Sequence, residues 1–241
     1  MVFQHEIEIA NGIFLSEHRA VFLKPLSVCV ISDLHIGLES GMLGVEMNVH
    51  IQEMQERIGK LIERYKPEKL VVNGDFKHTF SGNVKEEWEG VPEILDYLAE
   101  TVDVWIVRGN HDNFLQSITS KQNVKFVECL ELGNFIFLHG HKEFSFRPGS
   151  IYVLGHEHPA VKLSDRVGGY VKMPVFLWSQ NRFLLLPAFS PWTYGHDLAD
   201  GDVLLSSLRH ADYLEAEVVG WTEYGLLRMP RLRELLAAGR L

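Results

Sequence analysis

The segment Val28-Cys29-Val30-Ile31-Ser32-Asp33-Leu34-His35 joins four apolar residues to an acid and a histidine two positions apart. Such an apolar run is typical of a short strand buried on both faces, as in a parallel sheet. The same arrangement recurs four times: Leu70-Val71-Val72 before Asp75, Val104-Trp105-Ile106-Val107 before Asn110, Phe135-Ile136-Phe137-Leu138 before His139, and Ile151-Tyr152-Val153-Leu154 before His156. Because open α/β sheets place their sites at the carboxyl ends of strands, the repetition predicts one polar site shared by five strands.

Two segments with helical periodicity lie between the first three of these strands. Apolar residues recur at intervals of three and four after residue 50 and again after residue 87, namely Ile51, Met54, Ile58, Leu61 and Tyr65, then Trp88, Val91, Leu95 and Leu98. The first series predicts an amphipathic helix that ends near Pro67, and the second a helix before a strand from Val102 to Val107. Two strand-helix-strand units predict a largely parallel sheet.

The remaining segments are rich in strands. Asn11-Gly12 predicts a hairpin turn within the first 25 residues, and strand-like segments follow at 124–129, 134–138, 151–154, 171–177, 183–186 and 213–219. Residues 188–202 have the character of a long loop. Two sheets packed face to face with helices outside accommodate both halves, so we expect an α/β fold in the form of a four-layer α/β/β/α sandwich.

Size and composition fit one large domain. The 241 residues, 46% of them hydrophobic, predict a single domain over 1–241 without a separate capping domain. The net charge of −9 argues against a broad nucleic-acid surface. With no membrane-length apolar run and no signal-peptide pattern, we expect a cytoplasmic protein, and nothing in the sequence indicates its oligomeric state. Cys29 and Cys129 predict free thiols, and no spacing assigns either to a metal.

The polar residues after the strands are suited to two metal ions. On a continuing strand, Asp33 and His35 would point to the same side and grip one ion. Asp75 follows Gly74, which lets the backbone come close and leaves the carboxylate free to bridge two ions. We assign one ion to Asp33, His35, Asp75 and His158, and the other to Asp75, Asn110, His139 and His156. Oxygen and imidazole ligands without thiolate favour Mn²⁺, with Fe²⁺, Co²⁺, Ni²⁺ or Zn²⁺ as alternatives, over Mg²⁺.

His111 adjoins Asn110 but is surplus to the two ligand sets. We predict that it is catalytic, stabilising the transition state or giving a proton to the leaving oxygen, and that Asp112 orients its ring. His78 and His141 are candidates either for touching substrate phosphate or for hydrogen bonding a ligand, and the second role is favoured. His196 is interpreted as a loop residue. Phe189, Trp192 and Tyr194 are interpreted as loop anchors, with stacking on a substrate ring as the alternative.

The five motifs resemble those of the calcineurin-like metallophosphoesterase superfamily, whose signature runs DxH, GD, GNH[DE], H and GHxH. They stand here, in that order, as Asp33-Leu34-His35, Gly74-Asp75, Gly109-Asn110-His111-Asp112, His139 and Gly155-His156-Glu157-His158. Within the superfamily, Asn73-Gly74-Asp75-Phe76-Lys77-His78 and Leu186-Pro187-Ala188-Phe189-Ser190-Pro191 resemble the archaeal branch of small phosphoesterases related to the SbcD-type repair nucleases.

These motifs predict a dinuclear phosphoesterase that hydrolyses a phosphodiester or a phosphomonoester by in-line attack of a metal-bridging water. One alternative is a DNA nuclease of the repair-nuclease type, which the resemblance suggests and which the acidic balance and the short chain after the sandwich oppose. The other alternative is a non-catalytic scaffold of the same fold, which we disfavour because every ligand position is filled. Fold does not fix the substrate.

Overall fold

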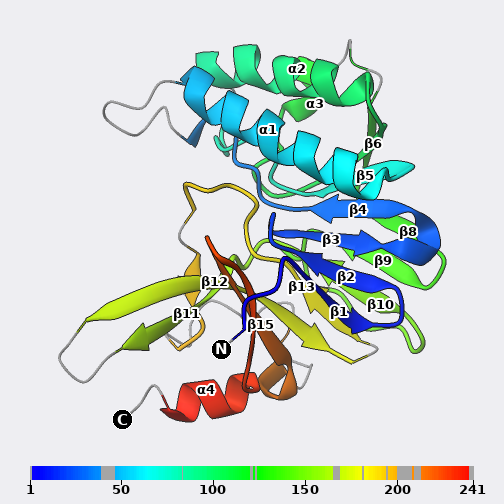
Figure 1. Ribbon diagram of the computed structural model, residues 1–241. Coiled ribbons are helices and arrows are strands. Elements are labelled where there is room, and N and C mark those ends of the chain that lie inside the picture. Colours follow the sequence, from blue (N-terminus) through cyan, green and yellow to red (C-terminus); the bar gives the residue numbers. More distant parts are fainter. Residues whose placement is uncertain are drawn as a thin grey trace.

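The structure is a computed structural model that describes residues 2–38, 47–82, 84–119, 122, 124–164, 169–180, 182–193, 195–199, 208 and 213–238 (Figure 1). Its described strands form two mixed sheets. In the first sheet the spatial order follows the chain: β1 (Glu6–Ala10), β2 (Ile13–Ser16), β3 (Ala20–Leu23), β4 (Val28–Ile31), β5 (Lys69–Asn73), β6 (Asp103–Val107) and β7 (Lys125–Val127). The pairs from β1 to β4 are antiparallel and those from β4 to β7 are parallel.

The second sheet crosses the chain order. It runs β14 (His196–Asp197), β11 (Pro159–Ser164), β12 (Tyr170–Ser179), β13 (Phe183–Leu185), β10 (Ile151–Leu154), β9 (Phe135–Leu138) and β8 (Leu130–Leu132). From β12 it branches to β15 (Glu217–Thr222) and then β16 (Gly225–Met229). The strands that precede His139 and His156, β9 and β10, are parallel neighbours, so their carboxyl ends lie at one edge.

Helices cover both outer faces (Figure 1). Helices α1 (Met47–Tyr65), α2 (Lys85–Ala99) and α3 (Leu115–Thr119) lie over the first sheet, and α4 (Leu232–Ala238) lies beside the second. Three buried apolar layers match this order, one between the helices and the first sheet, one between the sheets, and one that includes Leu232 of α4. The predicted α/β/β/α sandwich is confirmed. No helix in the described ranges is long and apolar enough to cross a membrane.

Strand β4 shows why the apolar runs form central strands. Cys29 and Ile31 face the layer under the helices, whereas Val28 and Val30 face the layer between the sheets. All four side chains are buried, because a strand alternates its side chains between faces and both faces of this strand are covered. The apolar run in the sequence is the direct consequence.

The predicted helices form, with one error at the start of α2. The α1 stripe is buried at Ile51, Met54, Ile58 and Leu61. In α2, Trp88 was predicted inside but its residue is 49% exposed. The inward position of that turn belongs to Glu87, which is fully buried beside Lys77, and Trp88 lies about 100° further round the helix.

The second half holds more strands than the sequence indicates. The Asn11-Gly12 hairpin is confirmed, but β8, β11 and β16 were not predicted, and residues 213–215 form a 3₁₀ turn before β15. The predicted loop 188–202 contains β14, which pairs with β11, while residues 194 and 200–202 lie outside the described part. These elements are short and partly exposed, so their apolar alternation is weak and pairing with neighbours decides them.

A buried amide joins the two sheets at their shared edge. Asn73, the last residue of β5, donates from Nδ2 to the carbonyl of Leu138 at 2.9 Å and to that of Val153 at 3.0 Å. Those acceptors lie in β9 and β10. Asn73 is fully buried, so its two donors replace water for two carbonyls of the other sheet.

We therefore expect Asn73→Ala to destabilise the protein by about 2–4 kcal/mol, since two hydrogen bonds are lost and buried carbonyls lose a partner. Urea unfolding followed by circular dichroism measures the change. Asn134→Ala, which alters an exposed amide, is the control and should stay within about 0.5 kcal/mol of the wild type. Equal stability of the two variants would refute the cross-sheet role of Asn73.

Candidate metal centre

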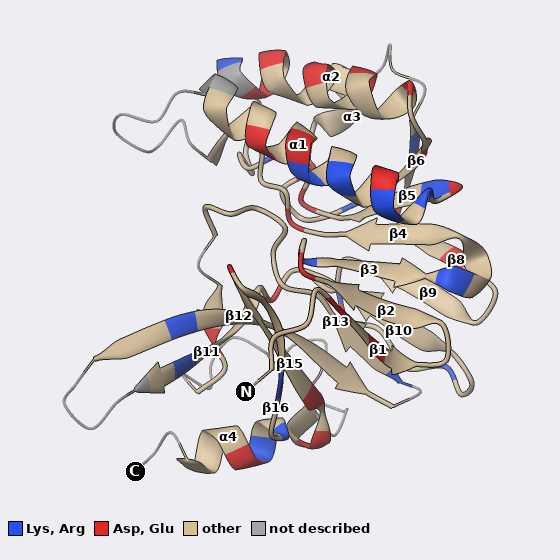
Figure 2. Ribbon diagram, in the orientation of Figure 1, with Lys and Arg blue, Asp and Glu red and all other residues tan. Residues whose placement is uncertain are grey.

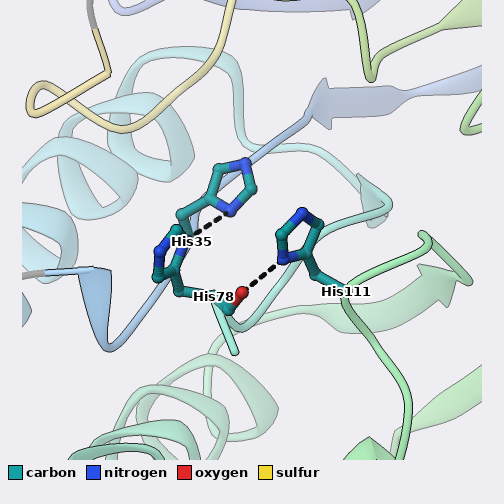
Figure 3. Close-up of side chains that lie close together, drawn as sticks. All are labelled: His35, His78 and His111. Carbon is teal, nitrogen blue, oxygen red and sulfur yellow. Dashed lines mark hydrogen bonds between the residues drawn. The ribbon is translucent and has the colours of Figure 1, made fainter. Parts of the chain in front are cut away.

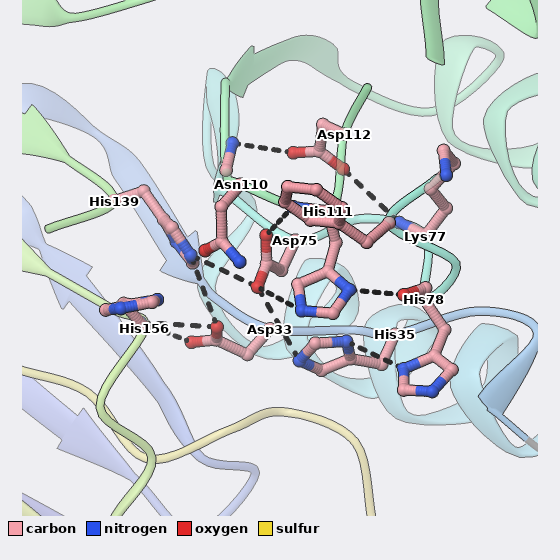
Figure 4. Close-up of polar contacts among 12 residues, drawn as sticks. Asp33, His35, Asp75, Lys77, His78, Asn110, His111, Asp112, His139 and His156 are labelled. Carbon is pink, nitrogen blue, oxygen red and sulfur yellow. Dashed lines mark hydrogen bonds and ion pairs between the residues drawn. The ribbon is translucent and has the colours of Figure 1, made fainter. Parts of the chain in front are cut away.

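The structure brings all seven predicted metal ligands and His111 to one place, where the strands of both sheets end. Figure 4 labels all of them except His158, which belongs to the cluster of Asp33, His35 and Asp75. Asp33 and His35 follow β4, Asp75 follows β5, Asn110 follows β6, and His139 and His156 follow β9 and β10. The shared edge arises because parallel strands end on the same side of a sheet and the two sheets meet there.

The backbone of the ligands is not extended. Strand β4 ends at Ile31, and Asp33 and His35 have φ angles of 59° and 49°. The expectation that both lie on a continuing strand is therefore wrong. Asp75, His156 and His158 also have positive φ angles, of 50°, 72° and 43°. For residues with a side chain this left-handed region costs about 1–2 kcal/mol each.

Hydrogen bonds between the loops hold this conformation. The amide of Asp33 donates to the carbonyl of Gly74 and that of His35 to the carbonyl of Asp75, each at 3.0 Å. The amide of His156 donates to the Asp33 carboxylate at 3.2 Å. Asp33, His35 and His156 are thus each tied to the loop of another ligand, which pre-organises the set.

Two motif glycines are required by close packing. At Gly74, with a φ of 90°, a Cβ atom would lie 2.1 Å from Nδ1 of His139. At Gly155 it would lie 1.9 Å from the hydroxyl oxygen of Ser32. Only glycine lets the loops approach this closely, which explains its place in these motifs.

The first predicted ligand set forms one buried cluster of Asp33, His35, Asp75 and His158. Nε2 of His158 lies 2.9 Å from Oδ1 of Asp33 and 3.2 Å from Nε2 of His35. Nε2 of His35 lies 3.8 Å from Oδ2 of Asp75. Four donor atoms therefore face one small space.

The second set shares Asp75 with the first. Asp75, His139 and His156 form a cluster, in which Nε2 of His139 lies 3.2 Å from Oδ2 of Asp75. Nδ1 of His139 lies 3.0 Å from the carbonyl of Asn73 and donates to it, which leaves Nε2 free for a ligand bond. Oδ1 of Asn110 is buried and has no hydrogen-bond partner among the described residues.

Burial and neighbouring charges set the protonation of the metal-free site. Burial alone would raise the pKa of Asp33, but His158 and His139 outweigh it and lower that pKa to about 2. The same balance, with His139 foremost, holds the pKa of Asp75 well below its usual range. Burial opposes a charge on His139, yet Asp75 and Asp33 raise its pKa to about 9.

Two other ligand rings are neutral. Burial, reinforced by His158, lowers the pKa of His35 to about 3. Burial, reinforced by His139, lowers the pKa of His156 to about 4. Two carboxylates, neutral imidazoles and an orphaned amide oxygen are the donors that a pair of divalent ions requires, so the residues fit the expected metal.

His111 lies beside both clusters and is held by main-chain groups. Its amide donates to Oδ1 of Asp75 at 2.9 Å, and its ring Nδ1 contacts the carbonyl of His78. Nε2 lies 3.9 Å from Oδ2 of Asp75, and the side chain is 26% exposed. The ring thus has one fixed nitrogen and one directed to the site.

The role predicted for Asp112 is wrong in its detail. Its Oδ1 accepts from the amides of Phe76 and Lys77, and its Oδ2 accepts from that of Gly109. The ring of His111 is oriented by the carbonyl of His78 instead. Asp112 ties the β5 loop to the β6 loop because its short side chain is buried between their backbones.

His78 closes the other end of the site (Figure 3). Its Nδ1 lies 3.3 Å from Nδ1 of His35, and its ring is nearly parallel to that of His111, with centroids 5.6 Å apart. The rings of His35, His78 and His111 also form a cluster of metal-ligand geometry. Of the two roles considered for His78, contact with a ligand residue is the one seen. His141 lies behind His139, with ring centroids 5.4 Å apart.

Two arginines, Arg19 buried and Arg57 half-buried, hold the loop after β13, and the sequence did not reveal them. Arg19 donates to the carbonyls of Ala188 and Ser190, and Arg57 to that of Phe189 at 2.6 Å. The amides of Phe189 and Ser190 in turn donate to the carbonyls of Ser32 and Asp33. Contacts 132 or more residues apart carry no sequence periodicity.

The aromatic residues of this loop differ in their surroundings. Phe189 is fully buried and anchors the loop, as predicted, whereas Trp192 lines a cavity beside His35 and His158; Tyr194 lies outside the described residues. His196, interpreted as a loop residue, lies in β14 with its ring 6.0 Å from that of His158.

Comparison with known proteins agrees with this geometry. A family model described as calcineurin-like phosphoesterase matches residues 26–219. No curated protein matches the chain. Among solved structures, the nuclease MPE of Pseudomonas putida is similar with a TM-score of 0.66 and 19% identity, over 95% of this chain and 100% of that one. That likeness establishes the fold alone.

Two further structures are similar only loosely. The phosphoesterase YfcE of E. coli has a TM-score of 0.41 and 16% identity, over 86% of this chain and 94% of that one. A Vps29 double mutant of Entamoeba histolytica has a TM-score of 0.33 and 14% identity, over 84% and 96%. Both are too distant to bear on the site, and the narrower resemblance to the archaeal branch stays a prediction.

We expect reconstitution with Mn²⁺ to load two ions per chain and to raise the melting temperature, because ions that bind only the folded state stabilise it. Elemental analysis and thermal scans measure both. Asn110→Ala should weaken the binding of one of the two ions, since the unpartnered Oδ1 is lost. Asn134→Ala, which alters an exposed amide, is the control and should bind both ions like the wild type. A wild type that takes up a single ion would overturn the shared role of Asp75.

The metal-free protein should lose stability as pH rises from 6.5 to 9. The pKa of His139 is raised to about 9 in the folded state, so its contribution is complete below 6.5 and is lost through 9. Asp33, whose pKa is lowered to about 2, contributes constantly across this window. Thermal scans in chelator should show the loss, and Mn²⁺ should remove it because a ligand imidazole is neutral.

His139→Gln should abolish the upper part of this pH dependence, near pH 9, in the metal-free state, because burial raises the pKa of Glu157 only to about 7 and its contribution ends lower in the window. His5→Gln, which alters an exposed histidine, should keep it. Identical pH profiles for His139→Gln and the wild type would show that another group titrates.

Proposed function

This chain belongs to the calcineurin-like phosphoesterase family, and from that premise we propose that it hydrolyses a phosphoester with two divalent ions, Mn²⁺ foremost, and water as the nucleophile. The observation that carries the proposal is the pair of buried donor clusters that share Asp75. Bound to these clusters, the ions would lower the pKa of a water molecule and stabilise the negative charge on the phosphoryl oxygens.

The ligand residues supply two different environments. Asp33, His35, Asp75 and His158 would hold one ion, and Asp75, Asn110, His139 and His156 the other. The first set offers two carboxylates and the second only the shared one, so the second is the less anionic. Asp75 is fixed for bridging, because its Oδ1 accepts the amide of His111 while its Oδ2 faces His139 and His35.

We assign His111 to the leaving oxygen. Its Nδ1 keeps a proton by donating to the carbonyl of His78, which directs Nε2 to the substrate. For this step the ring carries a proton on both nitrogens, so Nε2 gives its proton to the leaving oxygen as the P–O bond breaks and the ring is left neutral with its proton on Nδ1. The backbone amide of His111 donates to the carboxylate of Asp75, which ties the proton donor to a metal ligand. The His111 ring therefore keeps a fixed position relative to the reacting phosphorus.

A DNA nuclease is the second candidate. The similarity covers 95% of this chain and 100% of the nuclease MPE. The short chain after the sandwich is therefore a weak argument against a nuclease. The net charge of −9 opposes it. In Figure 2, Lys and Arg alternate with Asp and Glu on α1 rather than forming a basic face. A non-catalytic scaffold remains the least favoured reading, because the donor clusters are complete.

A panel assay with Mn²⁺ tests the proposal and separates the candidates. It compares bis(p-nitrophenyl) phosphate, p-nitrophenyl phosphate, cyclic nucleotides, and single- and double-stranded DNA. Hydrolysis of a small ester without DNA cleavage supports the leading proposal. DNA cleavage supports the nuclease, and an inert protein that carries both ions supports the scaffold.

Replacing His111 with Asn should leave both ions bound and lower turnover by about 10²–10⁴-fold, the usual worth of one positioned acid or charge-stabilising group. Asp75→Asn should lose metal and activity together. Steady-state kinetics and elemental analysis on the same samples measure the contrast, with His5→Asn as the control for an exposed histidine.

The leaving group provides a second readout. If His111 donates a proton, the defect of His111→Asn should shrink for esters of weakly basic leaving groups such as p-nitrophenolate. Full activity of His111→Asn on a strongly basic leaving group, or loss of its ions, would exclude the catalytic assignment.

A further inference from the structure

Two cavities flank the candidate metal centre at opposite ends. The Trp192 cavity, of about 330 Å³, is lined by His35, His111 and His158 together with Trp192. The Cys129 cavity, of about 460 Å³, is lined by His139 and His141 together with Cys129. Figure 4 shows His35 and His111 on one side of Asp33 and Asp75, and His139 and His156 on the other. Each cavity is therefore lined by histidines of a different donor cluster, so a phosphoester bound between the two clusters has one cavity at each end.

The Trp192 cavity is suited to the leaving arm. It contains His111, whose Nε2 is directed to the site, so the oxygen that receives the proton lies at this end. Its described lining residues include imidazoles, Trp192 and Leu38 but no carboxylate. Such a lining accepts a planar or apolar group and does not repel the negative charge that develops on the leaving oxygen.

The Cys129 cavity has a different lining. Leu138, Phe144 and Cys129 make part of it apolar. Two cations line it as well, but Arg108 and Lys142 both pair with Glu128, at 3.0 and 2.9 Å. With Glu143 also present, the charges of the lining balance. This favours an uncharged, bulky substituent over a second phosphate.

We propose that the substrate is a phosphodiester that spans both cavities, with the leaving arm in the Trp192 cavity and the retained arm in the Cys129 cavity. The inference rests on the proposed hydrolytic function and names its substrate class. A monoester has one arm, which would leave the larger cavity without a use. A diester with a bulky group on each oxygen uses both.

The reaction balances as one substitution at phosphorus. The water oxygen forms a bond to phosphorus and loses a proton to solvent. The P–O bond to the leaving arm breaks, its electron pair stays on the leaving oxygen, and that oxygen takes the proton of His111 Nε2. The products are an alcohol or phenol in the Trp192 cavity and a monoester whose single arm occupies the Cys129 cavity.

The test varies only the retained arm. Methyl, phenyl and naphthyl p-nitrophenyl phosphates share one leaving group and one charge, so their kcat/KM values compare the retained arm alone. With the Mn²⁺-loaded protein we expect kcat/KM to rise about tenfold or more from methyl to phenyl, the usual worth of a filled apolar pocket. Equal values across the series would overturn the proposal.

A thiol reagent closes the Cys129 cavity without a mutation. Cys129 is exposed, whereas Cys29 is buried, so a bulky maleimide selects Cys129. Burial and Glu131 raise the pKa of the Cys129 thiol, so labelling is done at mildly alkaline pH. We expect the label to reduce the phenyl-to-methyl ratio of kcat/KM to below about twofold. An unchanged ratio on fully labelled protein would place the retained arm elsewhere.

Two variants complete the design. In Cys129→Ser the maleimide should change kcat/KM for neither the phenyl nor the methyl ester. That result would show that the reduced phenyl-to-methyl ratio comes from the label on Cys129. Thr193→Trp, which fills the Trp192 cavity, should lower kcat/KM for every ester in the series because all share the leaving arm. If no ester is hydrolysed at all, the proposed function fails. If esters are hydrolysed but the series is flat, only the diester inference fails.

Discussion

The site depends on two sheets ending at the same edge, and Asn73 holds them there. Its Nδ2 donates to carbonyls of β9 and β10, and its own carbonyl lies 3.0 Å from Nδ1 of His139 and 2.9 Å from the hydroxyl of Ser32. One residue thereby fixes the sheet junction, the orientation of a ligand ring and the approach of the Asp33 loop. Gly74 and Asp75 follow it directly, so the bridging carboxylate starts from the same fixed point.

Stability and metal binding share the same charges. Asp33 and Asp75 are buried as carboxylates, a state that costs free energy unless cations compensate it. In the metal-free protein His139 supplies that charge, because the carboxylates raise its pKa to about 9. Divalent ions would take over this compensation and leave His139 as a neutral ligand. Binding therefore exchanges a proton for an ion at a site that is already formed.

The supports around the site are mostly main-chain groups. His111 is set by the carbonyl of His78, and Asp112 acts on three amides rather than on a ring. Lys77 and Glu87, fully buried as an ion pair 3.5 Å apart, fix the loop that carries His78, since Glu87 also accepts the amides of His78 and Thr79. Positive φ angles at the ligands are tolerated because each loop is bonded to its neighbour.

The sequence by itself determined the strands that carry ligands and the layered α/β/β/α fold. Runs such as Val28-Cys29-Val30-Ile31 are readable because a strand covered on both faces must be apolar throughout, and α1 because its buried stripe follows the helical period. The motifs also named the residues that meet in the metal clusters. These features depend on neighbours in the chain, so the order of residues records them.

Only the tertiary structure decided how those residues face one another. The left-handed backbone at Asp33 and His35, the carbonyl that orients His111 and the Arg57 clamp on Phe189 all arise from contacts between distant segments. The two cavities are likewise made by loops from both sheets. Such contacts leave no period or spacing in the sequence, because packing in three dimensions selects them and the local chain does not.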